Sequence, residues 1–213
     1  MNYSVLIVAG GKGERMGLGY NKVFYPLKDG KTVLDMTVKL FVDDVRCKQL
    51  VIVTNPHDLH KVTQTHEMGR IVNVGGGATR QDSVYNGLMC VTEDIVLVHD
   101  AARPYCTIEL IDELLLAMET EQAAFLAVDV KDTVKEVKDG YVVKTINREC
   151  LKNAQTPQAF KTSLLLDCIH QAQEDNFKAT DDAQLIERYS HVPIRVVKGS
   201  YDNIKITTPE DVR

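Results

Sequence analysis

A glycine-rich run, Gly10 to Gly17, combines the residue types that bind phosphate. It directly follows an apolar stretch, Ser4 to Val8, which predicts a first parallel strand. Glycines let the backbone turn sharply and bring its N–H groups close to an anion, because no Cβ stands in the way. Lys12 and Arg15 add positive charge inside the run, and Lys22 follows shortly after it. The run matches neither the Walker sequence nor the dinucleotide-binding fingerprint. A simple tight turn would not need these basic residues, so we expect a phosphate site here.

A second glycine loop, Gly75 to Gly77, opens a predicted helix that carries Arg80 and Ser83 near its start. Backbone N–H groups at such a helix start can bind an anion or contact the edge of a base. A flexible turn before an ordinary helix would explain the glycines, but it would not explain Arg80 and Ser83. We therefore treat the loop as a second candidate binding segment.

Asp100 directly follows a predicted buried strand, Ile95 to Val98. A carboxylate at a strand end is a suitable Mg²⁺ ligand, because magnesium prefers a carboxylate together with phosphate oxygens. The alternative is a structural ion pair between Asp100 and Arg103. We interpret His99 as a hydrogen-bonded histidine at the strand end rather than as a catalytic residue.

Two further polar clusters lie nearer the C-terminus. Gln155 to Gln158 provides amides and a hydroxyl in a segment that we expect to be irregular. In the second cluster, Lys205 and Thr207 would lie on the same side of a short strand. Thr207 or Thr208 would then cap a helix with proline at its first position.

Short β-rich runs alternate with helical patterns along the whole chain. The predicted strands are 4–8, 50–54, 95–98, 124–128 and 194–197, and the predicted helices are 108–115, with Thr107 as its cap, 161–173 and 181–189. This alternation predicts an α/β fold, a mostly parallel sheet with helices on both faces and with ligands at the carboxyl ends of its strands. The first glycine run and Asp100 both fall at that edge.

Residues 132–146 interrupt the alternation. Two short β-branched segments flank Asp139-Gly140, a strong hairpin turn signal. Both segments carry polar residues too often to be core. The hairpin is either an edge of the main sheet or an arm that projects and pairs with another subunit.

The bulk composition limits the class of protein. The chain has 213 residues, 44% of them hydrophobic and 26% charged, with a net charge of −5. A general nucleic-acid binder would usually carry a basic surplus, and we find neither a membrane-length apolar run nor a signal peptide. The five scattered cysteines form no Cys-x-x-Cys pair. We expect a cytoplasmic protein with reduced thiols and with no nucleic-acid or membrane partner.

The motifs also occur in a characteristic order: 11–16, 76–87, 99–104, 132–135, 155–158, 180–183 and 203–211. Together the series resembles the 2-C-methyl-D-erythritol 4-phosphate cytidylyltransferase family over essentially the whole chain. The resemblance implies a Rossmann-like nucleotidyltransferase fold, a single domain over 1–213, and CTP and Mg²⁺ as ligands. It also implies a homodimer formed through a β-arm at about 131–147.

The resemblance assigns a role to each candidate residue. The catalytic positions are Arg15, Lys22 and Lys205. The nucleotide positions are Ala9, Gly10, Gly11, Gly13, Gly77, Ser83, Asp100, Ala101 and Arg103, with Asp100 also the metal ligand. The positions for the polyol phosphate are Thr133, Arg148, Thr156, Thr180 and Thr207, of which Thr133 and Arg148 would come from the partner's arm.

The chain departs from the family pattern at a few positions. Its first loop reads Ala-Gly-Gly where Ala-Ala-Gly is usual, Asn21 stands where proline is common, and Ala78 stands where an acidic residue often follows the glycine pair. The implied reaction is attack of the polyol phosphate on the α-phosphorus of CTP with loss of pyrophosphate. Two alternatives remain: a ribitol 5-phosphate cytidylyltransferase and a catalytically inactive nucleotide-binding regulatory module.

Overall fold

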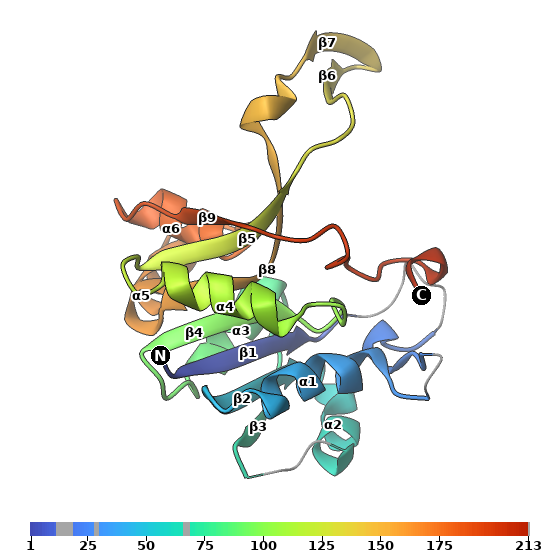
Figure 1. The fold of residues 1–213 in the computed structure, drawn as a ribbon, viewed down its shortest axis with the longest axis vertical. Helices are drawn as coiled ribbons and strands as arrows, with labels where there is room; N and C mark the ends of the chain where they lie inside the picture. The colour runs from blue at the N-terminus through green and yellow to red at the C-terminus, as the bar shows by residue number, and fades with distance from the viewer. Residues whose placement is uncertain (12–18, 28–29, 66–68, 213) are drawn as a thin grey trace.

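The computed structural model describes residues 1–11, 19–27, 30–65 and 69–212. Its main feature is a seven-stranded sheet in the order β3-β2-β1-β4-β8-β5-β9 (Figure 1). The strands are β1 (Tyr3–Ala9), β2 (Cys47–Thr54), β3 (Ile71–Gly75), β4 (Ile95–Asp100), β5 (Ala123–Asp129), β8 (Lys152–Lys161) and β9 (Arg195–Lys198). Only β8 runs antiparallel to its neighbours. The predicted α/β fold is therefore confirmed.

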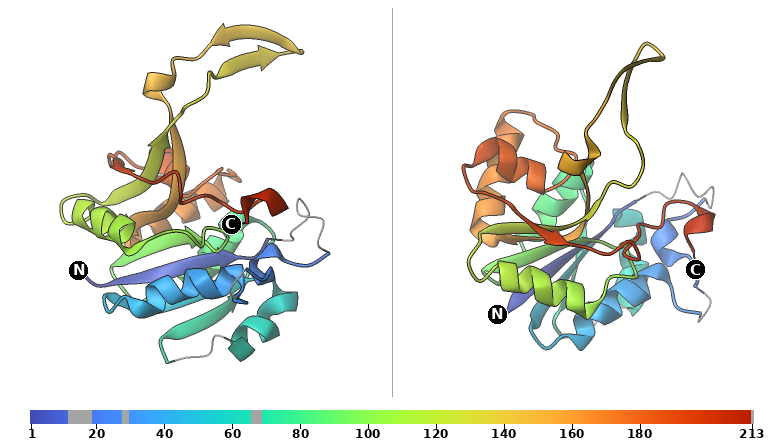
Figure 2. Two further views of the ribbon diagram at one scale, coloured as in Figure 1. Left: turned by 45° about the vertical axis from the view of Figure 1, so that its right-hand side comes forward. Right: turned by 45° about the horizontal axis from the view of Figure 1, so that its top comes forward.

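Helices cover both faces of the sheet (Figure 2). α1 (Val33–Asp43) and α4 (Ile108–Ala117) pack with Val5 and Ile7 of β1 on one face. α3 (Arg80–Leu88), α5 (Thr162–Glu174) and α6 (Ala183–Tyr189) pack on the other face, where Leu6 points. Successive side chains of a strand thus pack into two cores on opposite faces of the sheet, which explains why the sequences of β1 and β4 contain continuous apolar runs.

The remaining helical segments are short. They are η2 (Lys22–Phe24), η3 (Pro56–Asp58), α2 (Leu59–Thr65), η4 (Arg148–Cys150) and η5 (Pro209–Asp211). In the described part of the chain, no helix has the length and apolar character needed to cross a bilayer. All five cysteines are free thiols.

Strand β8 corrects the expectation of an irregular segment at Gln155 to Gln158. Polar residues and Pro157 made this segment resemble a loop. In the structure, Gln155 and Gln158 are buried and their amides bond to Ser200 O and Asp181 Oδ2. The β5–β8 ladder is also irregular here, since Phe125 pairs with Gln158 and Ala127 with Ala154. Pro157 therefore lies in a bulge, where it interrupts no ladder bond.

The C-terminal segment also differs from the prediction. Residues 204–207 form no strand, and one backbone bond from Ile206 N to Ala102 O ties them to the core. The predicted helix is the single turn η5. Thr208 directly precedes Pro209 and its carbonyl accepts from Asp211 N, so Thr208 occupies the predicted cap position. Its hydroxyl does not accept a capping bond, however, because the Asp211 carboxylate accepts from the N–H groups of Thr207 and Thr208 and from both hydroxyls.

The hairpin projects from the sheet as an arm (Figures 1 and 2). β6 (Lys135–Lys138) and β7 (Tyr141–Thr145) form a separate two-stranded sheet that is exposed along its length. Asp139 and Gly140 both have positive φ, at 51° and 83°, as the tightest hairpin turns require. The arm is part of the β5–β8 connection, so it leaves the sheet at the carboxyl end of β5. The alternative that the hairpin is an edge of the main sheet is wrong, because β6 and β7 form their own sheet and β9 is the edge strand beside β5.

Candidate active site

A cavity of about 270 Å³ lies at the carboxyl ends of β1 and β4. Its lining brings together residues from the end of β1, both glycine loops, η2, the start of α3, the end of β4 and the C-terminal segment. They are Val8, Ala9, Gly10, Gly11, Lys22, Val23, Gly77, Ala78, Thr79, Arg80, Ser83, Asp100, Ala102 and Lys205. The predicted convergence of the first glycine run and Asp100 at one edge is confirmed. Gly13 and Arg15 lie outside the described residues.

The second glycine loop is held tightly against β2 and α3. Gly76 N donates to Thr54 O at 2.7 Å, and Gly77 N donates to Ser83 Oγ at 3.1 Å. A Cβ on Gly77 would lie 2.3 Å from the Cβ of Asp82. Asp82 cannot move away easily, because its carboxylate and the Thr79 hydroxyl form the capping box that starts α3. Glycine is therefore required at Gly77 by close packing.

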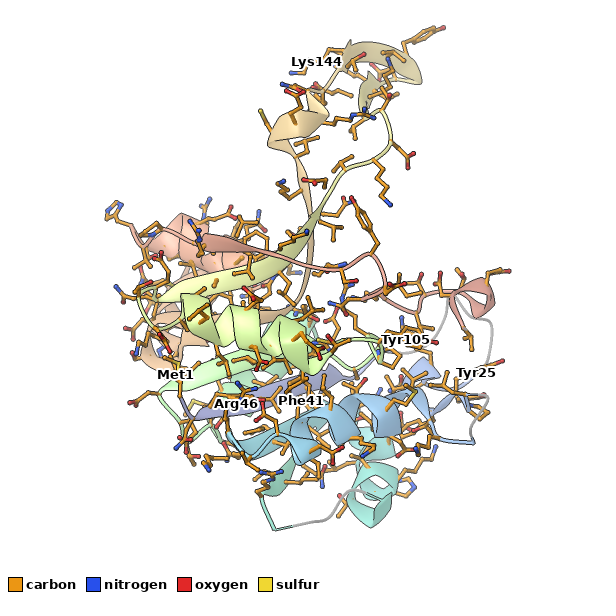
Figure 3. The ribbon with its side chains drawn as sticks, in the orientation of Figure 1. Met1, Tyr25, Phe41, Arg46, Tyr105 and Lys144 are labelled. Carbon is orange, nitrogen blue, oxygen red and sulfur yellow. The ribbon has the colours of Figure 1, made fainter. Side chains whose placement is uncertain are left out.

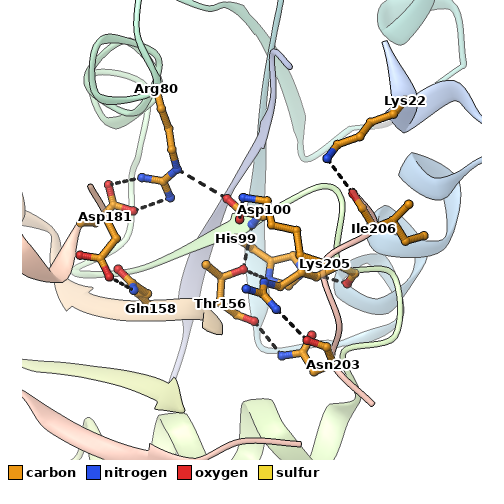
Figure 4. A network of polar contacts seen from close by, with 12 residues as sticks. Lys22, Arg80, His99, Asp100, Thr156, Gln158, Asp181, Asn203, Lys205 and Ile206 are labelled. Atoms are coloured by element: carbon orange, nitrogen blue, oxygen red, sulfur yellow. Dashed lines mark hydrogen bonds and ion pairs between the residues drawn. The ribbon is translucent and has the colours of Figure 1, made fainter. Parts of the chain in front are cut away.

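Asn21 joins the end of β1 to the turn that carries Lys22. Its Nδ2 donates to Ala9 O at 2.6 Å, and its Oδ1 accepts from Val23 N. Lys22 Nζ donates to Ile206 O at 2.6 Å (Figure 4). Asn21 thus takes a positioning role that the sequence analysis recorded only as a departure from the family pattern.

Asp100 lies between two cations in the cavity (Figure 4). Lys205 Nζ is 2.6 Å from Oδ2 and Arg80 Nε is 3.5 Å from Oδ1. Burial acts to raise the pKa of this carboxyl, but Arg80 and Lys205 outweigh it and lower the pKa to about 2. Asp100 is therefore ionised at neutral pH. The alternative of a structural Asp100–Arg103 pair is wrong, because the nearer partners are Arg80 and Lys205.

His99 and Thr156 fix the backbone of Asp100. His99 is fully buried, and this burial lowers its pKa to about 4, so the ring is neutral at pH 7. Its Nε2 faces Arg103 O at 3.2 Å and must carry the proton, since a carbonyl only accepts. Nδ1 then accepts from the Thr156 hydroxyl at 3.1 Å, and Thr156 Oγ1 accepts from Asp100 N at 3.0 Å. The interpretation of His99 as a hydrogen-bonded histidine is confirmed.

Several predicted site residues do not line the cavity. Ala101 is fully buried; its backbone N–H donates to Val8 O, and its carbonyl accepts from the Thr37 hydroxyl. Arg103 lies beneath the site and donates to Asn203 O at 2.7 Å. Thr180 is exposed and bonds to Gln184. Thr207 bonds to the Asp211 carboxylate.

Thr133 and Arg148 lie on the arm and are exposed. Arg148 Nη1 donates to Lys131 O at 2.5 Å within the same arm. Neither residue lines the cavity of its own chain. Their predicted role depends on a second subunit.

Asp182, Gln158 and Asn203 lie inside motifs of the sequence but had no predicted role, and Arg80 had no predicted partner. Arg80 forms a two-point ion pair with Asp182, at 3.1 Å from Nη1 and 2.7 Å from Nη2. Burial acts to lower the pKa of Arg80, but Asp182 and Asp100 raise it above the ordinary arginine value. Asn203 Nδ2 donates to Thr156 O at 2.9 Å. These partners are distant in the sequence, so no local spacing could have linked them.

A mostly parallel α/β sheet with a glycine-lined, cation-rich cavity at its carboxyl edge defines a nucleotide-binding enzyme of the nucleotidyltransferase class. Residues 3–213 match the family model described as "IspD: 2-C-methyl-D-erythritol 4-phosphate cytidylyltransferase", and the chain belongs to this family.

Individual relatives agree with this membership. A 2-C-methyl-D-erythritol 4-phosphate cytidylyltransferase from Geobacillus thermodenitrificans is 43% identical over 217 residues, which cover 100% of this chain and 94% of that protein. The Bacillus anthracis protein of the same name is 43% identical over 215 residues, with 99% and 94% covered.

Solved structures show the same fold. The 4-diphosphocytidyl-2C-methyl-D-erythritol synthase of Anaerococcus prevotii superposes with a TM-score of 0.88 at 33% identity, covering 99% of this chain and 94% of that one. The 2-C-methyl-D-erythritol 4-phosphate cytidylyltransferase of Francisella tularensis gives a TM-score of 0.85 at 36% identity, covering 100% and 97%.

The packing of the second glycine loop gives a first prediction. Gly77→Ala should weaken binding of CTP, the expected nucleotide, by about tenfold or more, because the added Cβ must push the loop away from Asp82. Calorimetric titration of CTP measures this. Gly75→Ala is the matched control, since a Cβ there meets its nearest atom, Pro56 Cγ, at 3.8 Å. Equal CTP affinity in the two variants would contradict the assignment.

Proposed function

We propose that this protein transfers a cytidylyl group from CTP to 2-C-methyl-D-erythritol 4-phosphate and releases pyrophosphate. The observation that carries the proposal is the cavity in which two glycine loops and three cations surround one ionised aspartate. The cations are Lys22, Arg80 and Lys205. Such a site suits two anionic substrates, and family membership supplies their identity.

The reaction needs positioning and charge stabilisation more than it needs a base. One phosphate oxygen of the polyol phosphate attacks the α-phosphorus of CTP, and pyrophosphate leaves in line. The attacking phosphate is already ionised near neutral pH, so no side chain has to remove a proton. Lys22 and Lys205 would stabilise the charge that grows on the phosphate oxygens, together with Arg15.

The nucleotide would lie along the two glycine loops. Backbone N–H groups of the first loop, at Ala9, Gly10, Gly11 and Gly13, would hold the triphosphate. Gly77 and Ser83 would contact the cytidine, and the Ser83 hydroxyl, which accepts from Gly77 N, would hold the loop in place for this contact. Ala78 has no polar side chain, so we attribute base recognition to the backbone.

Asp100 is the residue that would hold Mg²⁺. Within the described residues no three histidine, cysteine, aspartate or glutamate side chains are grouped to bind a metal. A single ionised carboxylate facing a phosphate cavity nevertheless fits Mg²⁺, which usually takes one or two carboxylates plus phosphate oxygens and waters. When bound, the ion would neutralise part of the triphosphate charge.

We infer a single nucleotidyltransferase domain over 1–213 that forms a homodimer through its arm. The arm carries Val137, Tyr141, Val142 and Val143, and each of these residues is more than half exposed. Apolar side chains gathered on one projecting hairpin support an interface between subunits. In such a dimer Thr133 and Arg148 would reach the polyol phosphate of the partner's site. The free cysteines are consistent with the expected cytoplasmic location.

Two alternatives compete with this proposal. A ribitol 5-phosphate cytidylyltransferase would share the nucleotide loops, but the relatives at 43% identity carry the methylerythritol name. An inactive nucleotide-binding module would not need Lys22, Asp100 and Lys205 gathered in one cavity. We therefore favour the active methylerythritol enzyme.

The substrate is tested by measuring pyrophosphate release with CTP and each polyol phosphate separately. We expect kcat/KM for 2-C-methyl-D-erythritol 4-phosphate to exceed that for ribitol 5-phosphate by about two orders of magnitude or more, because a site built to hydrogen-bond one polyol leaves groups unpaired with another. UTP in place of CTP serves as the nucleotide control and should react poorly. Faster turnover of ribitol 5-phosphate would refute the assignment, and no turnover of either would favour the inactive module.

The role of the arm is tested by mixing two inactive dimers. Lys22→Ala damages the cavity and Arg148→Ala damages the arm. If Arg148 serves the partner's site, a mixed dimer contains one site with both residues intact and one with neither. Random exchange makes half of the dimers mixed, so activity should recover to roughly a quarter of wild type. Exchange proven by mass spectrometry without recovery would place Arg148 outside the partner's site.

A further inference from the structure

Arg80 contacts two aspartates that belong to different parts of the site. Its Nε lies 3.5 Å from Asp100 Oδ1 in the nucleotide cavity. Its two Nη atoms bind both carboxylate oxygens of Asp182, which directly precedes α6. The Arg80 side chain is 31% exposed, and that of Asp182 only 2%. Arg80 therefore joins the cavity to a buried acidic anchor on another segment.

That segment, the 177–183 loop, is fastened by further polar contacts at both ends. Gln81 Nε2 donates to Phe177 O at 3.1 Å, and Gln81 Oε1 accepts from Ala179 N at 3.0 Å. On the other side, Gln158 Oε1 accepts from Ala183 N at 3.0 Å. The loop is thus held between the first turn of α3 and strand β8.

The loop carries Thr180, one of the residues expected to bind the polyol phosphate. Thr180 does not line the nucleotide cavity. The position of the 177–183 loop therefore determines how far Thr180 lies from a nucleotide in the cavity. α3 begins immediately after the second glycine loop, with Thr79 as its cap. The first turn of α3 therefore lies between the nucleotide loop and the 177–183 loop.

We propose that Arg80 is a positioning residue that fixes the 177–183 loop relative to Asp100, and so aligns the polyol phosphate with the bound nucleotide. This inference rests on the proposed function. The guanidinium can meet two carboxylates at once because it is a planar fork with five donors. A lysine at the same position keeps the charge but can hold one carboxylate well, not both.

The structure contains a matched control for this residue. Arg46 is also 31% exposed, also binds a buried aspartate, Asp44, and also contacts a second acid, Asp112. Its Nε and Nη2 lie 2.9 and 2.8 Å from the two Asp44 oxygens. Figure 3 shows Arg46 near Met1, at the end of the molecule opposite Tyr25 and Tyr105. The two arginines thus share their local chemistry, and only one adjoins the cavity.

The test compares Arg80→Lys with Arg46→Lys in the full-length protein. We expect Arg80→Lys to raise KM for the polyol phosphate about tenfold, since a displacement of about 1 Å has large effects on alignment. The Kd of CTP, measured by calorimetry without the second substrate, should change by less than about threefold because the charge in the cavity is kept. Arg46→Lys should change neither value.

Hydrogen exchange provides a readout that does not depend on activity. The amides of Ala179 and Ala183 should exchange faster in Arg80→Lys than in wild type or Arg46→Lys. A second variant, Asp182→Asn, removes the buried charge together with the ion pair, so it stays informative if Arg80→Lys folds poorly. It should reproduce both the rise in KM and the faster exchange.

The outcomes separate this inference from the proposed function. An unchanged KM in Arg80→Lys, or a loss of CTP affinity as large as the rise in KM, would overturn the positioning role. Wild-type protein that fails to turn over 2-C-methyl-D-erythritol 4-phosphate would instead refute the proposed function. The exchange comparison would still decide whether Arg80 fixes the loop.

Discussion

The site depends on one carboxylate, Asp100, held at the end of β4 between Arg80 and Lys205. A buried or half-buried charge is tolerated only when partners compensate for its lost hydration. Here Arg80 and Lys205 compensate Asp100, and Arg80 also pairs with the buried Asp182. Lys22 adds a further cation to the lining of the cavity.

The rest of the fold supplies what this carboxylate needs. β4 is a central strand, with β1 on one side and β8 on the other, and this fixes its backbone. β8 runs antiparallel, which brings Thr156 beside Asp100 N and lets His99 orient the hydroxyl. Lys205 comes from the C-terminal segment that crosses the carboxyl edge near Ala102. Segments far apart in the chain thus meet at one strand end, where open α/β sheets bind ligands.

Local sequence patterns predicted several elements of the fold, although β3 and α1 were not among them. Apolar runs located β1, β2, β4, β5 and β9, and Asp139-Gly140 located the hairpin. The glycine loops and Asp100 were correctly brought to one edge, because strand direction alone places them there. β8 was missed because its polar side chains are satisfied by distant partners, which no local pattern shows.

The same reason explains what was missed in the site. Arg80 and Asp182 are 102 residues apart in the chain, yet they form a two-point ion pair. Asn203 and Thr156, which are 47 residues apart, are also joined by a hydrogen bond. Residue type and spacing can identify a charged group, but its partner is set by how the β-strands are ordered. Tertiary contacts of this kind decide whether Asp100 is a structural ion or a ligand.

Calorimetric titration of CTP with and without Mg²⁺, in wild-type protein and in Asp100→Asn, tests the role of Asp100 most directly. In EDTA, the variant should bind CTP at least as tightly as wild type, because it lacks the carboxylate that repels the triphosphate. With Mg²⁺, wild type should gain affinity and the variant should bind about tenfold more weakly than wild type. Asp44→Asn, which removes another arginine-paired buried carboxylate, should behave as wild type in both conditions. An equal Mg²⁺ effect in Asp100→Asn and wild type would contradict the assignment of Asp100 as the centre of the site.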